Sequence, residues 1–261
     1  MKHLSKDFII KIQSNYIIQR VVIQYHNVIY IIKKSRQFMT TALIITTLNE
    51  IIGVKKIVPK INKEWVDEII FVDGGSTDGT IEEARKMGFK VIIQKKKGHG
   101  AAVLEGVNSI NSDNFILFGP DGNDEPEKIP LLIEKMNEGY DQVLVTRFGK
   151  GSINLDAGIV DSFGNKMFAF LANVFFGGKW TDTLNESRII SKKAFVELNF
   201  DAMDLSSTQQ MSIRGLKRKQ KICEIIGNEG ERVGGTRKMK PLGTGSSLSL
   251  GIIKEFIFWN R

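Results

Sequence analysis

The sequence is short of cysteine, and the apolar runs near its start and its end are brief. Cys223 is the one cysteine among 261 residues, so the chain can form neither an internal disulfide nor a zinc site built from cysteines. We therefore expect a reducing compartment, and we interpret Cys223 as a small apolar residue of a strand. Neither apolar run of the first 38 residues approaches the roughly 18 residues of a membrane span, and no small-residue cleavage site marks a signal peptide. Internal repeats and low-complexity linkers are lacking as well.

The positive charge of the chain is concentrated near its beginning. The formal net charge is +8, and residues 1–39 account for +6 of it, with seven Lys or Arg against Asp7 alone. The remaining 222 residues carry a net charge of +2. A nearly neutral body argues against a nucleic-acid-binding domain, so we expect no nucleic-acid partner.

Residues 1–38 differ in composition from everything after them. They are rich in Ile, Lys, Gln and Tyr, and their apolar cores are residues 21–25 and 28–32. Three interpretations are open: a basic segment that lies on a membrane surface, an extra packed element, or upstream sequence that is not part of the natural protein. We favour the third, because Met39 stands immediately before the first convincing strand, and we treat residues 1–38 as a basic N-terminal extension.

A regular alternation of strands and helices begins at Thr40. Short apolar runs that end at turns alternate with segments whose apolar residues recur at helical spacing. This alternation, with short loops, is typical of an α/β fold with a mostly parallel, buried sheet and right-handed crossovers. The expected strands are residues 42–46, 68–73, 90–94, 114–118 and 142–146, and the expected helices are residues 51–61, 80–87, 101–110 and 126–137.

The pattern changes after Arg147. Residues 228–247 are predicted to form a loop with a basic cluster, and residues 248–259 a short apolar helix that packs on the domain or lies in a membrane interface. We therefore divide the chain after its extension into an α/β domain, residues 39–227, and a basic loop with a terminal helix, residues 228–261. Before that loop we expect an apolar helix at 160–176, a strand at 186–190, helices at 192–198 and 205–219, the latter amphipathic, and a strand at 221–226. The large apolar residues that share one side of the 160–176 helix are Phe163, Met167, Phe170, Leu171 and Val174.

Polar side chains stand at the carboxyl ends of the first strands. The buried run before Gly119 stops at Asp121, and another strand ends at Asp73. With Asn49 and Glu50 after the first strand, these groups converge on the sheet edge where α/β proteins bind ligands. Oxygen ligands of this kind suit Mg²⁺ or Mn²⁺ holding a phosphate. The competing interpretation is that each acid only caps a helix.

A glycine-flanked histidine precedes the helix expected at 101–110. Gly98-His99-Gly100 places backbone N–H groups at a helix N-terminus, where they can meet a phosphate. The segment lacks the third glycine of the dinucleotide fingerprint and does not open the first βαβ unit, so we expect no nicotinamide cofactor. For His99 itself, a solvated loop histidine stands against a general base.

Four motifs follow one another between Thr40 and Asn123. They are Thr46-Thr47-Leu48-Asn49-Glu50, Val72-Asp73-Gly74-Gly75-Ser76-Thr77-Asp78-Gly79-Thr80, Gly98-His99-Gly100-Ala101-Ala102 and Gly119-Pro120-Asp121-Gly122-Asn123. In this order they resemble the motifs of family 2 glycosyltransferases of the GT-A fold, and most closely those of the dolichyl-phosphate mannose synthase-like branch. The similarity extends beyond Lys240 and leaves out the residues before Met39.

The resemblance implies a Rossmann-like GT-A sheet and a set of site residues. It places Glu50 and Asp73 near the base and ribose of a nucleotide, and Arg147 and Arg188 near the acceptor and the diphosphate. Residues 232–239 resemble the family's basic loop that closes over the phosphates. The catalytic residues implied are Asp121, Asp182, Glu186 and Arg188, with Asp121 also the metal ligand. The substrate-binding residues implied are Thr47, Asn49, Glu50, Asp73, Gly75, Ser76, Gly98, His99, Gly100, Pro120, Asn123, Arg147, Arg232, Arg237 and Lys238.

The chain departs from the family pattern at five positions. One motif carboxylate, Asp121, is left for the metal, because the first acid of the usual Asp-x-Asp is replaced. The departures are Thr46 for the usual Pro, Leu48 for an aromatic residue, Gly74 for the second Asp of Val-Asp-Asp-Gly-Ser, His99 for the Lys of Gly-Lys-Gly, and Gly119 for the first Asp of Asp-x-Asp.

The activity implied is inverting displacement at a sugar's anomeric carbon, with Mg²⁺ or Mn²⁺ neutralising the departing nucleoside diphosphate. A lipid-phosphate acceptor is already an anion, whereas a hydroxyl of a growing glycan needs a base, for which Asp182 and Glu186 are the candidates. Both acceptors stay open. We expect a nucleotide-sugar donor as a partner and a peripheral location on the cytoplasmic face of a membrane, and we leave a homo-oligomer open. The rival hypotheses are a degenerate nucleotide-sugar-binding protein and a sugar-1-phosphate nucleotidyltransferase, whose Gly-rich signature after the first strand is missing here.

Overall fold

The computed structural model describes residues 20–25, 28–33, 39–235 and 241–258. The chain divides into two compact units, Met1–Phe38 and Met39–Arg261. In the first unit, β1 (Arg20–Tyr25) and β2 (Val28–Lys33) form an antiparallel hairpin. The rest of that unit lies outside the described residues, so the three interpretations of residues 1–38 stay predictions.

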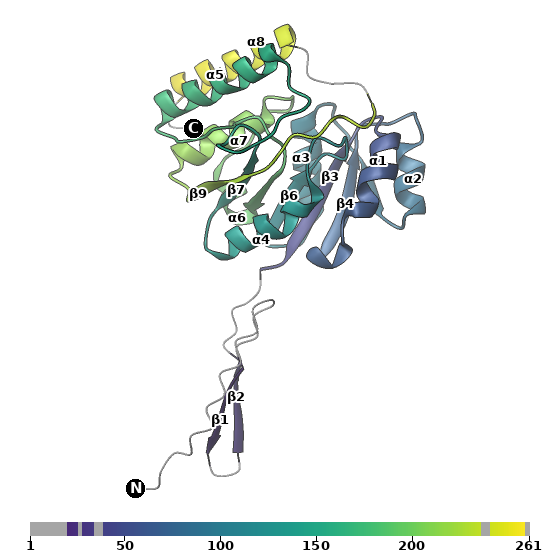
Figure 1. Ribbon diagram of the computed structural model, residues 1–261, viewed down its shortest axis with the longest axis vertical. Coiled ribbons are helices and arrows are strands. Elements are labelled where there is room, and N and C mark those ends of the chain that lie inside the picture. Colours follow the sequence, from purple (N-terminus) through teal and green to yellow (C-terminus); the bar gives the residue numbers. More distant parts are fainter. Residues whose placement is uncertain (1–19, 26–27, 34–38, 236–240, 259–261) are drawn as a thin grey trace. The chain divides into compact units, whose positions relative to one another are not determined.

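The second unit is built on a seven-stranded sheet (Figure 1). Its strands are β3 (Thr41–Thr47), β4 (Glu68–Asp73), β5 (Lys90–Ile93), β6 (Asn114–Phe118), β7 (Gln142–Thr146), β8 (Arg188–Ser191) and β9 (Ile222–Ile226). The order across the sheet is β5-β4-β3-β6-β8-β7-β9, and β8 alone of these strands runs antiparallel to its neighbours. The predicted mostly parallel α/β sheet is therefore confirmed, and β8 is inserted between β6 and β7, which the order of elements along the chain did not reveal.

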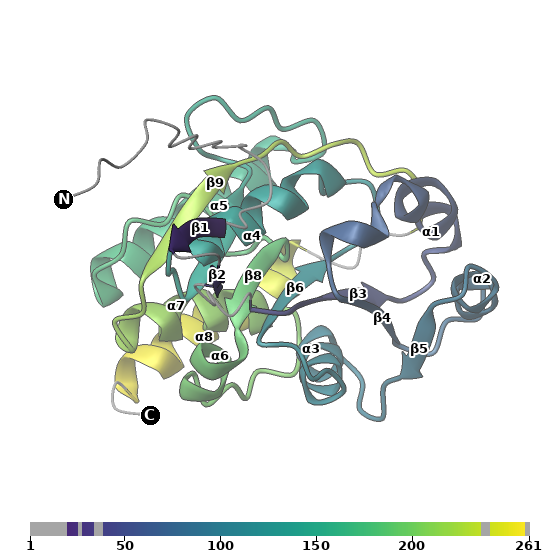
Figure 2. The same cartoon turned by 90° about the horizontal axis from the view of Figure 1, so that it is seen from below.

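Helices cover both faces of this sheet, as Figure 2 shows with α1 and α4 on one side and α3 and α6 on the other. In β3, Leu43 and Ile45 pack with α1 and α4, whereas Ala42 and Ile44 pack with α3 and α6. Since successive strand residues point to opposite faces, a strand covered on both faces must be apolar throughout, which is why these strands were recognisable in the sequence. The helices are α1 (Ile51–Ile57), α2 (Thr80–Lys86), α3 (His99–Asn108), α4 (Ile129–Asn137) and α6 (Lys192–Glu197), with 3-10 turns at Val58–Lys60, Lys63–Trp65 and Pro126–Lys128.

A further layer is formed by α5 (Ile159–Phe176), α7 (Ser207–Lys217) and α8 (Pro241–Ile257). The helices α5 and α8 lie side by side (Figure 1), and the rings of Phe175 and Phe256 are 5.2 Å apart. A small core that includes Phe168, Ile213 and Leu248 joins the three helices. This layer closes one side of the candidate site described below.

Buried ion pairs attach α8 to α7. The Arg214 Nε and Glu255 Oε1 atoms are 2.7 Å apart, and the Lys217 Nζ and Glu255 Oε2 atoms are 2.8 Å apart. All three side chains are at least nine-tenths buried. The helix predicted at 205–219 as amphipathic is thus buried around most of its circumference, because its polar residues have partners inside the protein.

The structure corrects one predicted boundary and one predicted helix face. The last helix begins at Pro241, so the prediction of a loop through residue 247 was wrong for its final part. Contacts of Leu248 and Ile252 with the core outweigh the low helix propensity of the glycines and serines before them. In α5, the apolar residues facing the small core are Phe168, Ala172 and Phe176. Of the stripe predicted on this helix, Met167 and Leu171 pack against this core, whereas Phe163, Phe170 and Val174 are 69%, 63% and 59% exposed.

Candidate functional site

A cavity of about 1000 Å³ opens at the carboxyl ends of β3, β4 and β6. Its polar floor includes Thr47 at the end of β3, Glu50 and Asp121 from the loops after β3 and β6, and Glu186 from the segment before β8. Its apolar wall comes from the α5–α8 layer, which contributes Val160, Phe163, Met167, Phe168 and Leu248. The cavity is thus charged at the sheet edge and apolar at the opposite side.

Asp73 organises the loop after β4. Its Oδ1 accepts hydrogen bonds from the backbone N–H groups of Gly75 and Ser76, at 2.8 and 2.6 Å. Its Oδ2 accepts from the hydroxyls of Ser76 and Thr47, both at 2.7 Å. Because the carboxylate is fully buried and its two oxygens are engaged, it fixes the loop rather than facing the cavity.

Asn49 joins the loops after β3 and β4. Its backbone N–H donates to Ser76 Oγ at 2.7 Å, and its Oδ1 accepts from Thr77 N at 2.8 Å. Of the residues predicted to bind substrate in these two loops, Thr47, Glu50 and Gly75 line the cavity, whereas Asn49 and Ser76 support it from behind.

The two glycines around His99 allow another chain segment to approach α3. A Cβ at Gly98 would overlap the carbonyl oxygen of Met203, and one at Gly100 would overlap that of Ala202. The backbone N–H of Ala101 donates to Met203 O at 3.3 Å, so part of this helix N-terminus is occupied by protein. Gly98 and His99 line the cavity and Gly100 does not.

The imidazole of His99 lies between two partners. Its Nδ1 is 2.6 Å from Ser207 Oγ, and its Nε2 is 3.0 Å from Glu186 Oε1. The same Glu186 oxygen accepts a hydrogen bond from Thr46 Oγ1 at 2.5 Å. Burial lowers the pKa of His99, but the charge and hydrogen bond of Glu186 outweigh this, so the pKa is raised above its ordinary value. The pKa of Glu186 is lowered, because His99 and Thr46 together outweigh the effect of burial.

Asp121 pairs with an arginine from the loop that follows β9. The Arg232 Nη2 and Asp121 Oδ2 atoms are 2.6 Å apart, and Arg232 Nη1 is 3.5 Å from Glu50 Oε1. The loop is held there by backbone bonds, from Val233 N to Asp121 O at 2.8 Å and from Gly230 N to Asn123 O at 3.1 Å. Four predicted site residues, Glu50, Asp121, Asn123 and Arg232, are therefore brought together.

Asp124 belongs to the same cluster, although the sequence analysis missed it. It lines the cavity, is 8% exposed, and its pKa is raised well above its ordinary value by burial and then by the charges of Asp121 and Glu186. Burial also raises the pKa of Asp121, which Arg232 only partly offsets. The signal available in the sequence was its place three residues after Asp121, in the same loop.

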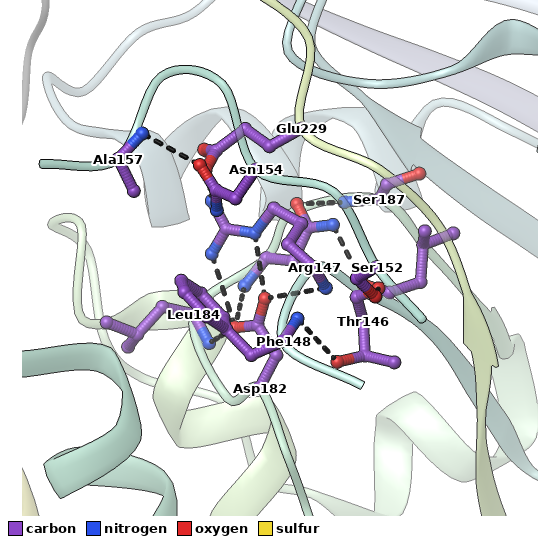
Figure 3. A network of polar contacts seen from close by, with 12 residues as sticks. Thr146, Arg147, Phe148, Ser152, Asn154, Ala157, Asp182, Leu184, Ser187 and Glu229 are labelled. Atoms are coloured by element: carbon purple, nitrogen blue, oxygen red, sulfur yellow. Dashed lines mark hydrogen bonds and ion pairs between the residues drawn. The ribbon is translucent and has the colours of Figure 1, made fainter. Parts of the chain in front are cut away.

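Arg147 forms a largely buried polar network at the cavity wall, and Figure 3 shows its contacts. Its Nε donates to Asp182 Oδ2 at 2.7 Å, its Nη2 to Asp182 Oδ1 at 3.2 Å, and its Nη1 to Glu229 Oε1 at 2.8 Å. Burial by itself lowers the pKa of Arg147, but Asp182 and Glu229 raise it above its ordinary range. Arg147 reaches the cavity wall, Asp182 does not, and Glu229, which the sequence analysis did not identify, lines it.

Arg188 lies outside the cavity lining. Its guanidinium donates to the carbonyl of Asn185 at 2.6 Å and to Ser212 Oγ at 3.0 Å, and burial lowers its pKa to about 10. This residue therefore supports the segment before β8. Its predicted catalytic role, like that of Asp182, stays a prediction, and Arg237 and Lys238 lie outside the described residues.

The residues around Asp121 fit a divalent cation that is held partly by the protein and partly by a bound substrate. Among the described residues, no three His, Cys, Asp or Glu side chains converge closely enough to hold a metal ion by themselves. Asn123 Oδ1 is buried and has no hydrogen-bond partner in the described part of the chain. An amide oxygen and one or two carboxylates, completed by phosphate and water, are a ligand set typical of Mg²⁺.

No helix in the described segments is long and apolar enough to cross a membrane.

Comparison with known proteins identifies the family. The model of glycosyl transferase family 2 matches residues 42–198. A dolichyl-phosphate hexose transferase of Haloferax volcanii is 28% identical over 83% of this chain and 94% of its own length. A dolichol-phosphate mannosyltransferase of Pyrococcus furiosus is 31% identical over 43% of this chain, which spans 34% of that relative's length.

A solved structure has the same fold. Glucosyl-3-phosphoglycerate synthase from Mycobacterium tuberculosis, in complex with Mn²⁺, UDP and phosphoglyceric acid, superposes with a TM-score of 0.68 at 18% identity, over 86% of this chain and 79% of that one. The resemblance found in the motifs is confirmed. The chain belongs to glycosyl transferase family 2, is similar to its dolichyl-phosphate hexose and mannose transferases, and is a glycosyltransferase of the GT-A fold.

Proposed function

We propose that this enzyme transfers a sugar from a nucleoside-diphosphate donor to a polyprenyl phosphate, with inversion at the anomeric carbon. The observation that carries the proposal is the two-sided cavity, which joins a floor containing Asp121 and Glu186 to a wall containing Phe163 and Leu248. A diphosphate suits the charged floor when a cation accompanies it, and an isoprenoid chain suits the apolar wall. The names of the Haloferax and Pyrococcus relatives, which refer to dolichyl phosphate, agree with this acceptor.

The donor end of the proposed site is the cluster of Glu50, Asp121, Asn123 and Arg232. Asp121 and Asn123 would hold Mg²⁺ or Mn²⁺, and Arg232 would turn from Asp121 to the diphosphate when the donor binds. The loop at 228–235 would thus act as part of a lid, a role that its glycines and its backbone bonds to residues 121 and 123 support. When bound, the cation neutralises negative charge that develops on the leaving nucleoside diphosphate.

The acceptor determines whether the enzyme needs a general base. A phosphate oxygen is already an anion at neutral pH, so it attacks the anomeric carbon from the face opposite the diphosphate without losing a proton. A hydroxyl acceptor would need a base. Asp182 is buried against Arg147, and the lowered pKa of Glu186 makes it a weak base, so the phosphate acceptor is favoured.

The apolar surface of α5 and α8 supports attachment to a membrane, on the cytoplasmic face in our proposal. Besides Phe163 and Phe170, this surface includes Ile253 and Phe256, which are 53% and 52% exposed. An apolar patch beside the proposed acceptor wall would let a lipid phosphate enter from the bilayer. Vesicles containing anionic phospholipid should bind wild type at least about tenfold more tightly than Phe163→Ser/Phe170→Ser, because two phenyl groups contribute more than 1.4 kcal/mol.

A matched control comes from the other side of the sheet. Leu131 on α4 is 43% exposed, and Leu131→Ser should leave vesicle binding unchanged. If the double variant binds vesicles as tightly as wild type, the membrane proposal is contradicted. It is also contradicted if Leu131→Ser weakens vesicle binding as much as the double variant does.

A donor assay tests the proposed chemistry. Purified protein is incubated with Mn²⁺, polyprenyl phosphate and a panel of nucleotide sugars, and nucleoside diphosphate release is measured. The rate with the correct donor should fall at least ~100-fold in Asp121→Ala, as expected for loss of a main electrostatic stabiliser. Equal rates for both proteins would exclude Asp121 from the reaction.

A further inference from the structure

The glycine at position 119 has no structural explanation. Its φ is not in the left-handed region, and a Cβ built there would meet its nearest neighbours at 3.5 Å or more, which is ordinary van der Waals contact. Gly53 and Gly122, close by, differ, since a side chain at either would collide with the backbone of another segment or with Val233. The backbone would therefore accept a side chain at 119.

The atoms nearest to that Cβ position all belong to carboxylates. They are Glu186 Oε2 at 3.5 Å, Asp121 Oδ1 at 3.9 Å and Asp124 Oδ2 at 3.9 Å. An acidic side chain at position 119, where the family pattern has the first Asp of Asp-x-Asp, would thus point toward these three carboxylates. In this chain the same space is faced by the carboxylate of Glu186, from the segment that precedes β8.

The register of β8 on β6 explains how Glu186 reaches this position. The antiparallel pairs run from Asn114↔Ser191 to Leu117↔Arg188. Extending this register by two residues puts Gly119 opposite Glu186. Directly opposed residues of an antiparallel pair place their side chains on the same face, about 5 Å apart. The carboxylate absent at 119 is therefore available from the opposing residue.

The Glu186 side chain is held in one orientation. Its Oε1 accepts from Thr46 Oγ1 at 2.5 Å and is 3.0 Å from His99 Nε2, while Oε2 is the atom nearest to position 119. Thr46, His99 and Gly119 are three of the five departures from the family pattern, and all three meet at Glu186.

An independent observation indicates a ligand in the same cavity. Asn123 is 9% exposed and lines the cavity, and its Nδ2 donates to Asp156 and Glu229, at 2.9 and 3.4 Å. Its Oδ1 is buried and has no partner within the described residues. A buried amide oxygen without a donor is unfavourable unless a ligand satisfies it.

We propose that Glu186 takes the place of the missing acid at 119 and, with Asp121 and Asn123, binds the divalent cation that accompanies the donor diphosphate. The inference rests on the proposed function, because it assigns a ligand to the metal of that same site. Three oxygen ligands from the protein, completed by diphosphate oxygens and water, satisfy an octahedral cation.

Mn²⁺ binding tests this inference without relying on activity. Mn²⁺ is titrated into the full chain in the presence of UDP or GDP, and free Mn²⁺ is followed by its electron paramagnetic resonance signal. Glu186→Gln should weaken binding by at least about tenfold, since even outer-shell partners of metals contribute about that much. Glu82→Gln, which removes an exposed acid of α2, should bind as wild type does.

Moving the carboxylate from position 186 to position 119 gives a more specific test than removing it. In Glu186→Gln/Gly119→Asp, Mn²⁺ affinity should return to within about threefold of wild type, because the acid is restored at the residue opposite position 186. If the double variant binds as poorly as Glu186→Gln, the inference is overturned. If Glu186→Gln does not fold, the single variant Gly119→Asp tests the inference. We expect it to bind Mn²⁺ more tightly than wild type, and unchanged Mn²⁺ affinity would contradict the inference.

Asp121→Asn separates the two proposals. If it loses Mn²⁺ while Glu186→Gln keeps wild-type affinity, the inference about Glu186 fails and the proposed function stands. If neither variant changes Mn²⁺ binding, the metal site of the proposed function fails as well.

Discussion

Removing Arg147 should destabilise the fold severely. Its guanidinium makes three contacts, two with Asp182 and one with Glu229, whose side chains are 0% and 4% exposed. Arg147→Ala leaves both acids buried without their cation, and breaking a buried ion pair from one side costs about 3–5 kcal/mol. In a domain of this size, 1 kcal/mol lowers the melting temperature by about 2–4 °C, so we expect a decrease of about 6–20 °C by calorimetry.

Two comparisons make the test specific to this network. Lys55→Ala removes a pair between an exposed lysine and the partly buried Glu83, 3.8 Å apart, and should cost at most about 1 kcal/mol. Arg147→Lys keeps the charge but loses the forked geometry, so its melting temperature should lie between those of wild type and Arg147→Ala. An Arg147→Ala protein that melts with wild type and is altered only in the KM for the acceptor would refute the structural role and favour the acceptor-binding role implied by the family resemblance.

Two further predictions concern pH and packing. The pKa of His99 is raised in the folded protein, so its pairing stabilises the fold below about pH 6.5, and this stability is lost as the pH rises through the folded pKa. The pKa of Glu186 is lowered, so its pairing stabilises the fold above about pH 4.5, and this stability is lost as the pH falls through the folded pKa. The stability difference between wild type and His99→Gln, from denaturant unfolding, should therefore be largest between these values, and a difference that is flat from pH 5 to 9 would contradict the pairing. Gly53→Ala should cost about 1–3 kcal/mol, because its Cβ would overlap the carbonyl of Pro120. Gly164→Ala, in open space on α5, should not destabilise, and equal melting of the two variants would contradict the predicted collision.

The sheet could be predicted where the chain is buried on both faces. The strands at 42–46, 68–73 and 114–118 were recognisable because each contains a run of consecutive large apolar residues, and they lie within a residue of β3, β4 and β6. The position of β8 could not be predicted, since the order of elements along the chain does not fix which strands pair. The start of α8 was missed because its packing on α5 and α7 outweighs the glycines and serines of its first turns.

The candidate site was foreseen in part. Asp121, His99 and Glu186 are far apart in the sequence, and the structure brings them to one cavity. Asp182 and Arg188 were assigned from the family resemblance alone, and the structure places both outside the cavity lining. Their burial against Arg147 and against the carbonyl of Asn185 depends on tertiary packing, which the sequence does not show. The meeting of Thr46, His99 and Glu186 likewise depends on strand register, which the sequence does not state.

The most direct test of the proposed function is the identity of the acceptor. Wild-type protein is supplied with radiolabelled donor sugar, Mn²⁺ and either polyprenyl phosphate or the matching polyprenol, and label in the organic phase is counted. We predict transfer to the phosphate, none to the alcohol, and loss of at least ~100-fold in Asp121→Asn. Equal transfer to both lipids, or transfer that Asp121→Asn leaves unchanged, would contradict a phosphate acceptor bound at this cavity.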